Sequence, residues 1–363
     1  MDTKPTNKKN AYLDALDKRV LVFDGAMGTT LQTLNLSAKD YGGEHLSGCN
    51  DALVLVNPDV VLGVHRAFLE AGADVVETNT FRSNRLTLAD YNLQDHVLEL
   101  NEKAASLARQ AANEFFTPEK PRFVAGSMGP SGKLISTDDP EMSDISFDEL
   151  TDIFREQAVG LIRGGVDLLL IETSNDILEV KAAINGIRQA FAEEQRWLPI
   201  QAQVTLDVNG KMLLGTDITA VTAILDGMGV NVIGLNCSTG PEHMRESIEY
   251  LTSQSTLPIS VIPNAGLPLN IDGLAVYPMT PDEFSEQLAG YVARNGVRIV
   301  GGCCGTRPEH IAVLAETIAE IEAFRAKGQS GAMLSSSVQA VEIEQKPAPF
   351  IIGERMNAQG SKA

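Results

Sequence analysis

Residues 297–305 read VRIVGGCCG, and residues 231–237 read NVIGLNC. Each stretch begins with a short apolar run of the kind that forms a buried strand, and each run leads directly into cysteine. The chain has four cysteines, and three of them, Cys237, Cys303 and Cys304, occupy these two places. Because the ends of parallel strands converge on one face of an α/β barrel, we expect the three thiols to meet there.

Three thiolates at one point form a zinc site with one open position, which is the catalytic rather than the structural pattern. Neighbouring residues of a regular strand point to opposite faces, so Cys303 and Cys304 share a metal only if the backbone bends. Gly302 and Gly305 flank the pair and permit such a bend. Two buried free cysteines or a vicinal disulfide are the alternatives, and the pattern favours Zn²⁺.

This set of ligands also indicates a type of chemistry. A free thiol with a pKa of ~8.5 is mostly protonated at neutral pH, whereas zinc deprotonates a thiol that coordinates it. Because three thiolates already over-neutralise the metal, a fourth sulfur stays electron-rich. We therefore expect attack of a sulfur on an electrophilic methyl group rather than hydrolysis.

The order of apolar runs predicts the fold class. Eight runs of strand length alternate with helical patterns, which is typical of a parallel sheet covered by helices. Eight such units in ~310 residues fit an α/β fold of the (β/α)8 TIM-barrel type, with the zinc site at the C-terminal ends of the strands. An open doubly wound sheet is the alternative, but no Gly-x-Gly-x-x-Gly opens the first helix. We expect strands at 20–23, 73–77, 122–125, 166–171, 200–205, 231–235, 259–262 and 297–300, and helices at 11–18, 59–71, 94–115, 147–163, 177–192, 219–228, 241–251, 281–294 and 308–327.

Composition excludes several classes of protein. The net charge of −19 over 363 residues argues against a broad nucleic-acid-binding surface. No apolar run approaches the ~18 residues of a membrane span, and the polar N-terminus lacks the apolar core of a signal peptide. Clustered thiols indicate a reducing compartment, so we expect a cytoplasmic protein.

Polar groups gather after the predicted strands, at the expected barrel mouth, as in the active sites of such barrels. None of the five histidines lies at a strand end, which argues against a Ser-His-Asp or Cys-His hydrolase. Cys49 lies in a loop and is not expected to bind the metal. The strand-end groups are Asp24, Glu77-Thr78-Asn79-Thr80, Ser127-Met128-Gly129-Pro130, Glu172-Thr173, Asp207, Asn236-Cys237, Pro263-Asn264-Ala265-Gly266 and Cys303-Cys304.

The chain divides into three parts by composition. Residues 1–327 form the expected barrel, and residues 328–349, without helical or strand period, are predicted to be a linker. Residues 350–363 begin FIIGERMNAQG and are predicted to open a second domain. A terminal strand that packs on the barrel is the alternative.

The motifs of residues 20–327 resemble the homocysteine S-methyltransferase family. The specific part is the two-part cysteine signature, GLNC at 234–237 and GGCCGT at 301–306. The tail at 350–363 is similar to the opening of the folate-binding domain that follows this barrel in cobalamin-dependent methionine synthases. The other matching motifs are DGAMGT at 24–29, ETNTF at 77–81, GSMGPSG at 126–132 and PNAG at 263–266.

The resemblance implies methyl transfer to homocysteine to give methionine, with methylcobalamin as donor and with cobalamin- and folate-binding modules as partners. Asp24 and Glu172 would hold the amino group of homocysteine. Asn264 follows the seventh predicted strand, and its amide oxygen would fill the fourth zinc position; a bond within its own turn is the alternative. Backbone N–H groups would receive the substrate carboxylate, from Gly25, Ala26, Met27, Gly28 and Thr29.

Two alternatives stay open from the sequence. Within the family, betaine or S-methylmethionine could serve as donor to a stand-alone enzyme. Outside it, the chain could be a non-catalytic zinc-binding protein or a thiol redox protein. The carboxylates Asp24 and Glu172 favour a small amino-acid ligand over the second class.

Overall fold

The computed structural model describes residues 10–135, 143–271, 274–322, 324–326, 328–329 and 331–343. Its centre is a parallel eight-stranded sheet in the order β1-β10-β7-β6-β5-β4-β3-β2. A parallel bridge between Phe23 and Val75 joins the first and last strands and closes the barrel, which confirms the expected (β/α)8 fold. The strands are β1 (Leu21–Val22), β2 (Val75–Glu77), β3 (Phe123–Met128), β4 (Leu168–Ser174), β5 (Ile200–Val204), β6 (Val232–Asn236), β7 (Ile259–Ile262) and β10 (Ile299–Val300).

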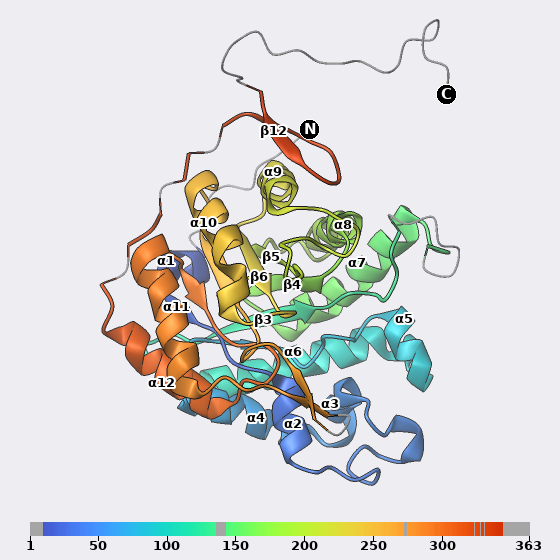
Figure 1. Cartoon of the computed structure of the whole chain (residues 1–363). Helices are drawn as coiled ribbons and strands as arrows, with labels where there is room; N and C mark the ends of the chain where they lie inside the picture. Colours follow the sequence, from blue (N-terminus) through green and yellow to red (C-terminus); the bar gives the residue numbers. More distant parts are fainter. Residues whose placement is uncertain are drawn as a thin grey trace, which may run out of the picture.

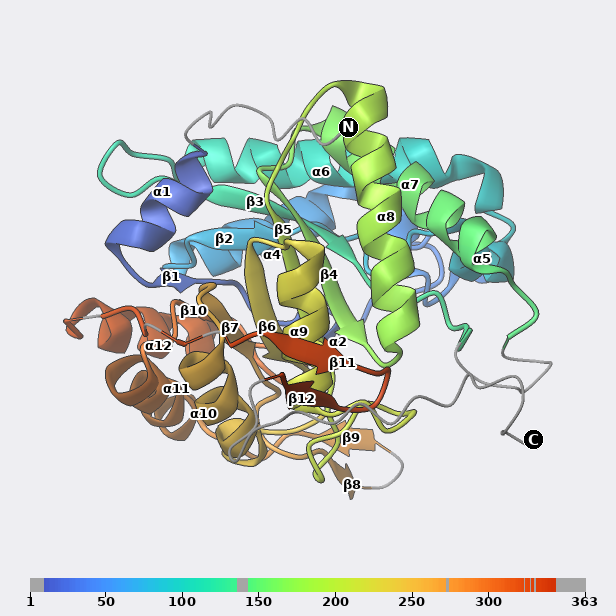
Figure 2. The same cartoon turned by 90° about the horizontal axis from the view of Figure 1, so that it is seen from above.

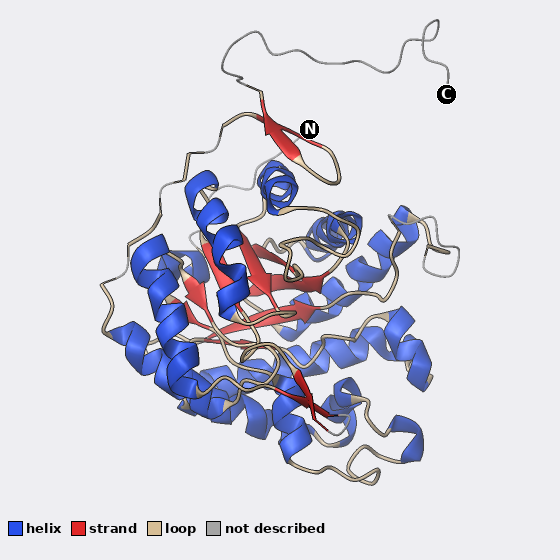
Figure 3. Cartoon of the chain, in the orientation of Figure 1, coloured by secondary structure: helices blue, strands red, loops and turns tan. Residues whose placement is uncertain are grey.

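Helices cover the outside of the barrel (Figures 1 and 3). Several begin at the side-chain caps that a helix N-terminus prefers, such as the capping boxes of Ser146 with Glu149 and of Thr280 with Glu283. The outer helices are α4 (Pro58–Glu70), α6 (Val97–Glu114), α7 (Phe147–Gly164), α8 (Ile177–Glu194), α9 (Ile218–Met228), α10 (Arg245–Gln254), α11 (Pro281–Asn295) and α12 (Pro308–Ala319). Shorter elements are α2 (Met27–Thr33), α3 (Leu53–Val56), α5 (Arg85–Leu88) and the 3-10 turns Glu44–Leu46, Asn50–Ala52, Ala89–Tyr91, Gln94–His96 and Pro241–Met244.

Alternate residues of the strands build two apolar layers. Side chains such as Leu21, Phe123 and Leu168 point inward and fill the barrel. Their neighbours Val22 and Val124 point outward and pack under the helices. Both faces of each strand are thus buried, which explains why the runs are continuously apolar.

Helix α1 (Ala11–Lys18) closes the end of the barrel where the strands begin. The Tyr12 hydroxyl donates to Gln201 Oε1 over 2.6 Å, and its ring meets Phe123 edge-on. The Arg298 guanidinium donates to the Leu16 carbonyl from the other side. The opposite end of the barrel, where the strands finish, holds the cavity described below.

Near the end of the chain, one helix is shorter than expected and the predicted linker contains paired strands. Helix α12 was expected to reach residue 327 but ends at Ala319, where the hydrogen bonds tighten to the i→i+3 type at Glu320 and Ile321. The predicted linker contains a hairpin, β11 (Met333–Ser335) paired with β12 (Ala340–Glu342). Strands of three residues give too short an alternation to be recognised in the sequence.

This hairpin lies across helix α9 (Figure 2). The Asp217 N–H donates to the Val338 carbonyl, and the Thr219 hydroxyl accepts from the Ala340 N–H. Residues 331–343 therefore pack on the barrel. Residues 350–363 lie outside the described residues, so the predicted second domain stays a prediction.

A second hairpin, β8 (Leu269–Ile271) with β9 (Leu274–Val276), follows β7 and was not expected. Within the described part of the chain, no single helix is both long and apolar enough to span a membrane. The bent pair Asn50–Val56 and Pro58–Glu70 meets that criterion only when the two helices are combined. Its side chains Val61 and Phe68 are buried in the core.

Candidate active site

A cavity of about 360 Å³ opens at the end of the barrel where the strands finish. Its size lies within the usual ~300–1,000 Å³ of small-molecule sites. Ten of the eleven site residues predicted from the sequence line it: Asp24, Gly25, Ala26, Met27, Gly28, Thr29, Glu172, Cys237, Cys303 and Cys304. The eleventh, Asn264, is buried next to this region of the barrel end, as described below.

Three sulfur atoms form a tight cluster at one side of the cavity. The Sγ atoms of Cys237, Cys303 and Cys304 all lie within 4.8 Å of one another. The Sγ atoms of Cys237 and Cys304 are 3.9 Å apart, and all three residues are free cysteines. Cys49 lies apart from them, packed with Leu46 and Ala52.

The cluster has the dimensions of a tetrahedral zinc site. Zinc–sulfur bonds of about 2.3 Å place two tetrahedral ligands about 3.8 Å apart, close to the 3.9 Å between Cys237 and Cys304. The side-chain oxygen of Asn264 is buried and has no hydrogen-bond partner. A buried amide oxygen without a partner is costly, and a metal ion would supply one.

The thiols respond to one another electrostatically. Hydrogen bonds from Cys237 and Cys303 lower the pKa of the Cys304 thiol to about 3. Hydrogen bonding to Cys237 and Cys304 raises the pKa of Cys303 well above its ordinary value. One thiolate is thus stabilised by two neutral thiols, and a bound cation would allow all three to ionise.

The backbone bends at both cysteine positions, but by different means. Cys237 and Ser238 adopt left-handed φ values of 60° and 61°, so the first bend uses non-glycine residues. Beyond Cys304, Gly305 has a φ of 81°, and a Cβ there would lie 2.2 Å from the Tyr277 ring. A bend at the flanking glycines was expected, whereas the strained Cys237 could not be read from the sequence.

Three carboxyl groups, those of Asp24, Glu77 and Glu172, also belong to residues that line the cavity. Burial raises the pKa of Glu172 to about 7. Burial, together with the neighbouring Glu172 carboxyl, raises the pKa values of Asp24 and Glu77 well above the ordinary range. One oxygen of Asp24 accepts the Glu77 N–H, and the other is buried without a partner. This acidic group is suited to receive a cation such as an ammonium.

The side chains that complete this acidic group were not predicted from the sequence. Glu77 was noted only as a strand-end residue, because nothing in a single carboxylate marks it for substrate. Ser127 and Asn236 were noted in the same way, yet both donate to the Glu172 carboxylate. Their only signal in the sequence is their position at the ends of β3 and β6.

The small-residue turn after β1 continues into helix α2, which the sequence did not predict. Its first helical residue is Met27, and the Ala26 N–H donates to Thr306 Oγ1. The N–H groups of a first helical turn have no partner within the helix. Met27, Gly28 and Thr29 line the cavity, so the N–H groups of this turn are suited to bind an anion.

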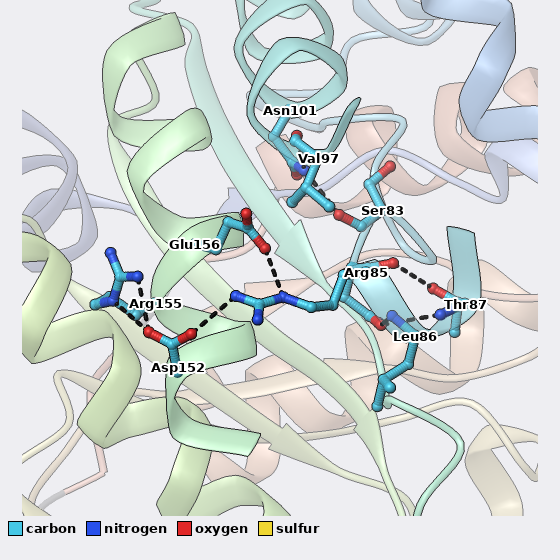
Figure 4. Close-up of polar contacts among 10 residues, drawn as sticks. Ser83, Arg85, Leu86, Thr87, Val97, Asn101, Asp152, Arg155 and Glu156 are labelled. Atoms are coloured by element: carbon cyan, nitrogen blue, oxygen red, sulfur yellow. Dashed lines mark hydrogen bonds and ion pairs between the residues drawn. The ribbon is translucent and has the colours of Figure 1, made fainter. Parts of the chain in front are cut away.

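The outer wall of the cavity comes from Phe81, Arg82 and the helix α5 that follows. Figure 4 shows how this helix is held: Arg85 donates to Glu156 over 2.8 Å and to Asp152 over 2.9 Å, both on α7. The Asn101 amide of α6 donates to the Ser83 carbonyl. The wall is thereby tied to two outer helices.

Comparison with known proteins assigns the chain to a family. The family model described as "Homocysteine S-methyltransferase" matches residues 21–318. The chain belongs to the homocysteine S-methyltransferase family. This membership confirms the resemblance carried by the motifs, and it makes the chain a member of a family of methyltransferases.

Curated relatives of this family member include the methionine synthases of Mycobacterium tuberculosis and Mycobacterium leprae. The first is 43% identical over 350 residues and the second 42% over 355 residues. Each alignment covers 96% of this chain but only 29% of the relative. The chain thus spans less than a third of the length of these methionine synthases.

Solved structures of the homocysteine methyltransferase MmuM from Escherichia coli share the fold. The metallated form is 26% identical, with a TM-score of 0.66, and the match covers 84% of this chain and 98% of that one. The apo form gives a TM-score of 0.61 with 83% and 97% coverage.

Proposed function

We propose that this chain transfers a methyl group to the thiol of L-homocysteine to give L-methionine, as the homocysteine module of a cobalamin-dependent methionine synthase. One observation carries this proposal. The three-sulfur cluster opens into the same cavity as an acidic group and the first turn of a helix. These features match a thiol, an ammonium and a carboxylate, which are the three polar groups of homocysteine.

Cys237, Cys303 and Cys304 would hold Zn²⁺, with the Asn264 side-chain oxygen in the fourth position before substrate binds. The unpartnered Asn264 oxygen and the 3.9 Å sulfur spacing support this assignment. When bound, zinc supplies thiolate activation, because it lowers the pKa of a coordinating thiol below neutral pH.

The other residues orient the substrate. Asp24 and Glu172 receive the ammonium, since one Asp24 oxygen is buried and free of hydrogen bonds. The N–H groups of the Gly25 to Thr29 segment, at the start of α2, receive the carboxylate. Glu77 completes the acidic group: burial and the neighbouring Glu172 and Asp24 carboxyls raise its pKa, and a bound ammonium would favour the ionised form of these carboxyls. At the wall of the cavity, the ion pairs between Arg85 of α5 and α7 hold the residues that shield the bound substrate.

We assign methylcobalamin as the methyl donor, presented by a cobalamin-binding module, with a folate-binding module as a further partner in cis or trans. Higher identity to the methionine synthases than to MmuM supports this choice over betaine or S-methylmethionine. Free thiols fit a reducing compartment, so we assign the protein to the cytoplasm.

A thiol redox role is the competing proposal from another class. Two features argue against it: the three sulfurs are close enough to share one ion, and the adjacent acidic group has no use in disulfide exchange. Such a protein would hold thiols and disulfides but bind no amino acid.

The proposal is tested by methionine formation from L-homocysteine by the zinc-loaded chain. Methylcobalamin, betaine and S-methylmethionine are compared as donors, each with and without enzyme. Turnover with methylcobalamin is expected. Turnover with betaine or S-methylmethionine alone would assign a stand-alone enzyme, and no methionine with any donor would overturn methyl transfer.

A further inference from the structure

Asn236 is the last residue of β6 and is fully buried, with none of its surface exposed. It immediately precedes Cys237, the first of the clustered cysteines. Its side chain does not pair with the neighbouring strand β5 but reaches β4, where it contacts Glu172 and Thr173. Inward-pointing side chains of alternate strands meet in this way inside a barrel.

The hydrogen bonds of the Asn236 amide fix its orientation. Its Oδ1 accepts the Thr173 N–H over 2.8 Å, so Oδ1 must face the backbone of β4. Its Nδ2 therefore faces the other way and donates to Thr173 Oγ1 over 2.8 Å and to Glu172 Oε2 over 3.2 Å. Both polar atoms of the amide are hydrogen-bonded, and Nδ2 is the one that contacts Glu172.

These bonds act where the strand is irregular. Thr173 has a left-handed φ of 57°, and the register between β4 and β5 shifts between Ile171 and Ser174. A non-glycine residue with this φ is strained and needs support from its surroundings. The Asn236 oxygen supplies that support by accepting the N–H which the irregular strand leaves unpaired.

Glu172 is thus held from both sides. Ser127 Oγ donates to Glu172 Oε1, and Asn236 Nδ2 donates to Glu172 Oε2. A carboxylate that accepts a hydrogen bond on each oxygen cannot rotate freely, and these bonds favour its ionised form. Without Asn236, one oxygen of a buried carboxylate would lose its partner, and the side chain could turn away from the cavity.

We propose that Asn236 is a positioning residue for substrate recognition: it holds the Glu172 carboxylate in the orientation that receives the amino group of a thiol amino acid. The proposal rests on the proposed function, since it presumes that homocysteine binds in this cavity. Asn236 also directly precedes Cys237 in the chain, so this residue links the acidic group to the sulfur cluster. Asn236 acts through Glu172 and does not itself contact substrate.

The test measures binding by calorimetry to the zinc-loaded chain, with L-homocysteine and with 4-mercaptobutanoate, which lacks the amino group. Asn236→Ala is expected to weaken homocysteine binding by roughly tenfold or more, as for loss of a hydrogen bond to a charged group. Its affinity for 4-mercaptobutanoate and its zinc content should remain at the wild-type values. Asn236→Thr, which suits a strand end, provides the same test if the alanine variant does not fold.

The matched control is Asn231→Ala, at the residue that immediately precedes the first residue of β6. Asn231 Oδ1 also accepts a backbone N–H, that of Ile200, over 2.9 Å. This bond lies at the start of β6, whereas Asn236 contacts Glu172 at its end. This variant should bind homocysteine like the wild type. In the Glu172→Gln background, Asn236→Ala should cause little further loss, because coupled residues are non-additive.

Three results would overturn the proposal: wild-type homocysteine binding by Asn236→Ala, equal losses for homocysteine and 4-mercaptobutanoate, or an undiminished loss in the Glu172→Gln background. Each leaves the proposed function standing. Failure of the wild-type chain itself to bind homocysteine would instead overturn the proposed function, and this inference with it.

Discussion

The Sγ atoms of Cys237 and Cys304 lie 3.9 Å apart, although 67 positions separate the two residues in the chain. Two strands, β6 and β10, deliver them to one end of the barrel, with β7 between. The distance is that expected for two ligands of one tetrahedral zinc ion. It is too long for a disulfide bond, whose sulfurs lie about 2.05 Å apart.

Each clustered cysteine is predicted to be essential for metal binding. Cys237→Ala, Cys303→Ala and Cys304→Ala should each lose zinc and methyl transfer, because two thiolates are too few for this geometry. Zinc content by atomic absorption and methionine formation are the measurements. Cys49→Ala is the control and should keep both, since Cys49 lies outside the cluster. Activity that survives complete removal of the metal would contradict the zinc assignment.

Asp24→Asn and Glu172→Gln are predicted to weaken homocysteine binding while zinc stays bound. Each change removes a charge-assisted contact to the substrate ammonium, worth on the order of 1.5–3 kcal/mol. Calorimetry with homocysteine and with 4-mercaptobutanoate separates this effect from a general one. Equal losses for the two thiols would show that the carboxylates do not receive the amino group.

Asn264→Ala is predicted to weaken zinc binding in the absence of substrate. The loss should be on the order of 10–100-fold, the range found for groups that support metal ligands. Homocysteine should restore the affinity, because its sulfur replaces the missing ligand. A chelator competition with and without homocysteine gives the answer. An unchanged affinity without substrate would assign Asn264 to its own turn, where its backbone carbonyl accepts the Gly266 N–H.

Glu179 is predicted to make stability depend on pH. Burial raises the pKa of this α8 carboxyl, which accepts the Ser131 N–H, to about 7, against about 4.3 in the unfolded chain. Between these values the folded state binds more protons, so its contribution to stability is full below pH ~4.3 and is lost as the pH rises to 7. Glu179→Gln should therefore flatten the decline in Tm between pH 5 and pH 8.

The same substitution at the exposed Glu320 is the control for this experiment and should leave the pH dependence of Tm unchanged. A decline in the Glu179→Gln protein as steep as in the wild type would show that Glu179 does not carry a raised pKa.

The barrel could be predicted from the sequence because its strands are buried on both faces. Runs such as Leu168–Ile171 are continuously apolar, and Gly165 at the end of α7 marks the boundary between helix and strand. The cysteine cluster could be predicted because thiols are rare in this chain and each follows such a run. Position at a strand end was thus enough to bring Cys237, Cys303 and Cys304 together.

Features that depend on contacts between distant segments could not be predicted. The hairpin β11–β12 has strands of three residues, and its place is set by hydrogen bonds to Asp217 and Thr219 at the start of α9. Asn236 resembles any other strand-end asparagine until the barrel brings it to Glu172. The left-handed conformations of Thr173 and Cys237 likewise arise from their surroundings, since neither residue favours that conformation.

The central claim, that a three-cysteine zinc site binds the thiol of homocysteine, is tested most directly by zinc X-ray absorption spectroscopy of the zinc-loaded chain. We predict three sulfur ligands and one oxygen or nitrogen ligand before substrate, and four sulfur ligands after L-homocysteine is added. A first shell that does not change on addition of homocysteine, or one with fewer than three sulfurs at the start, would contradict the account.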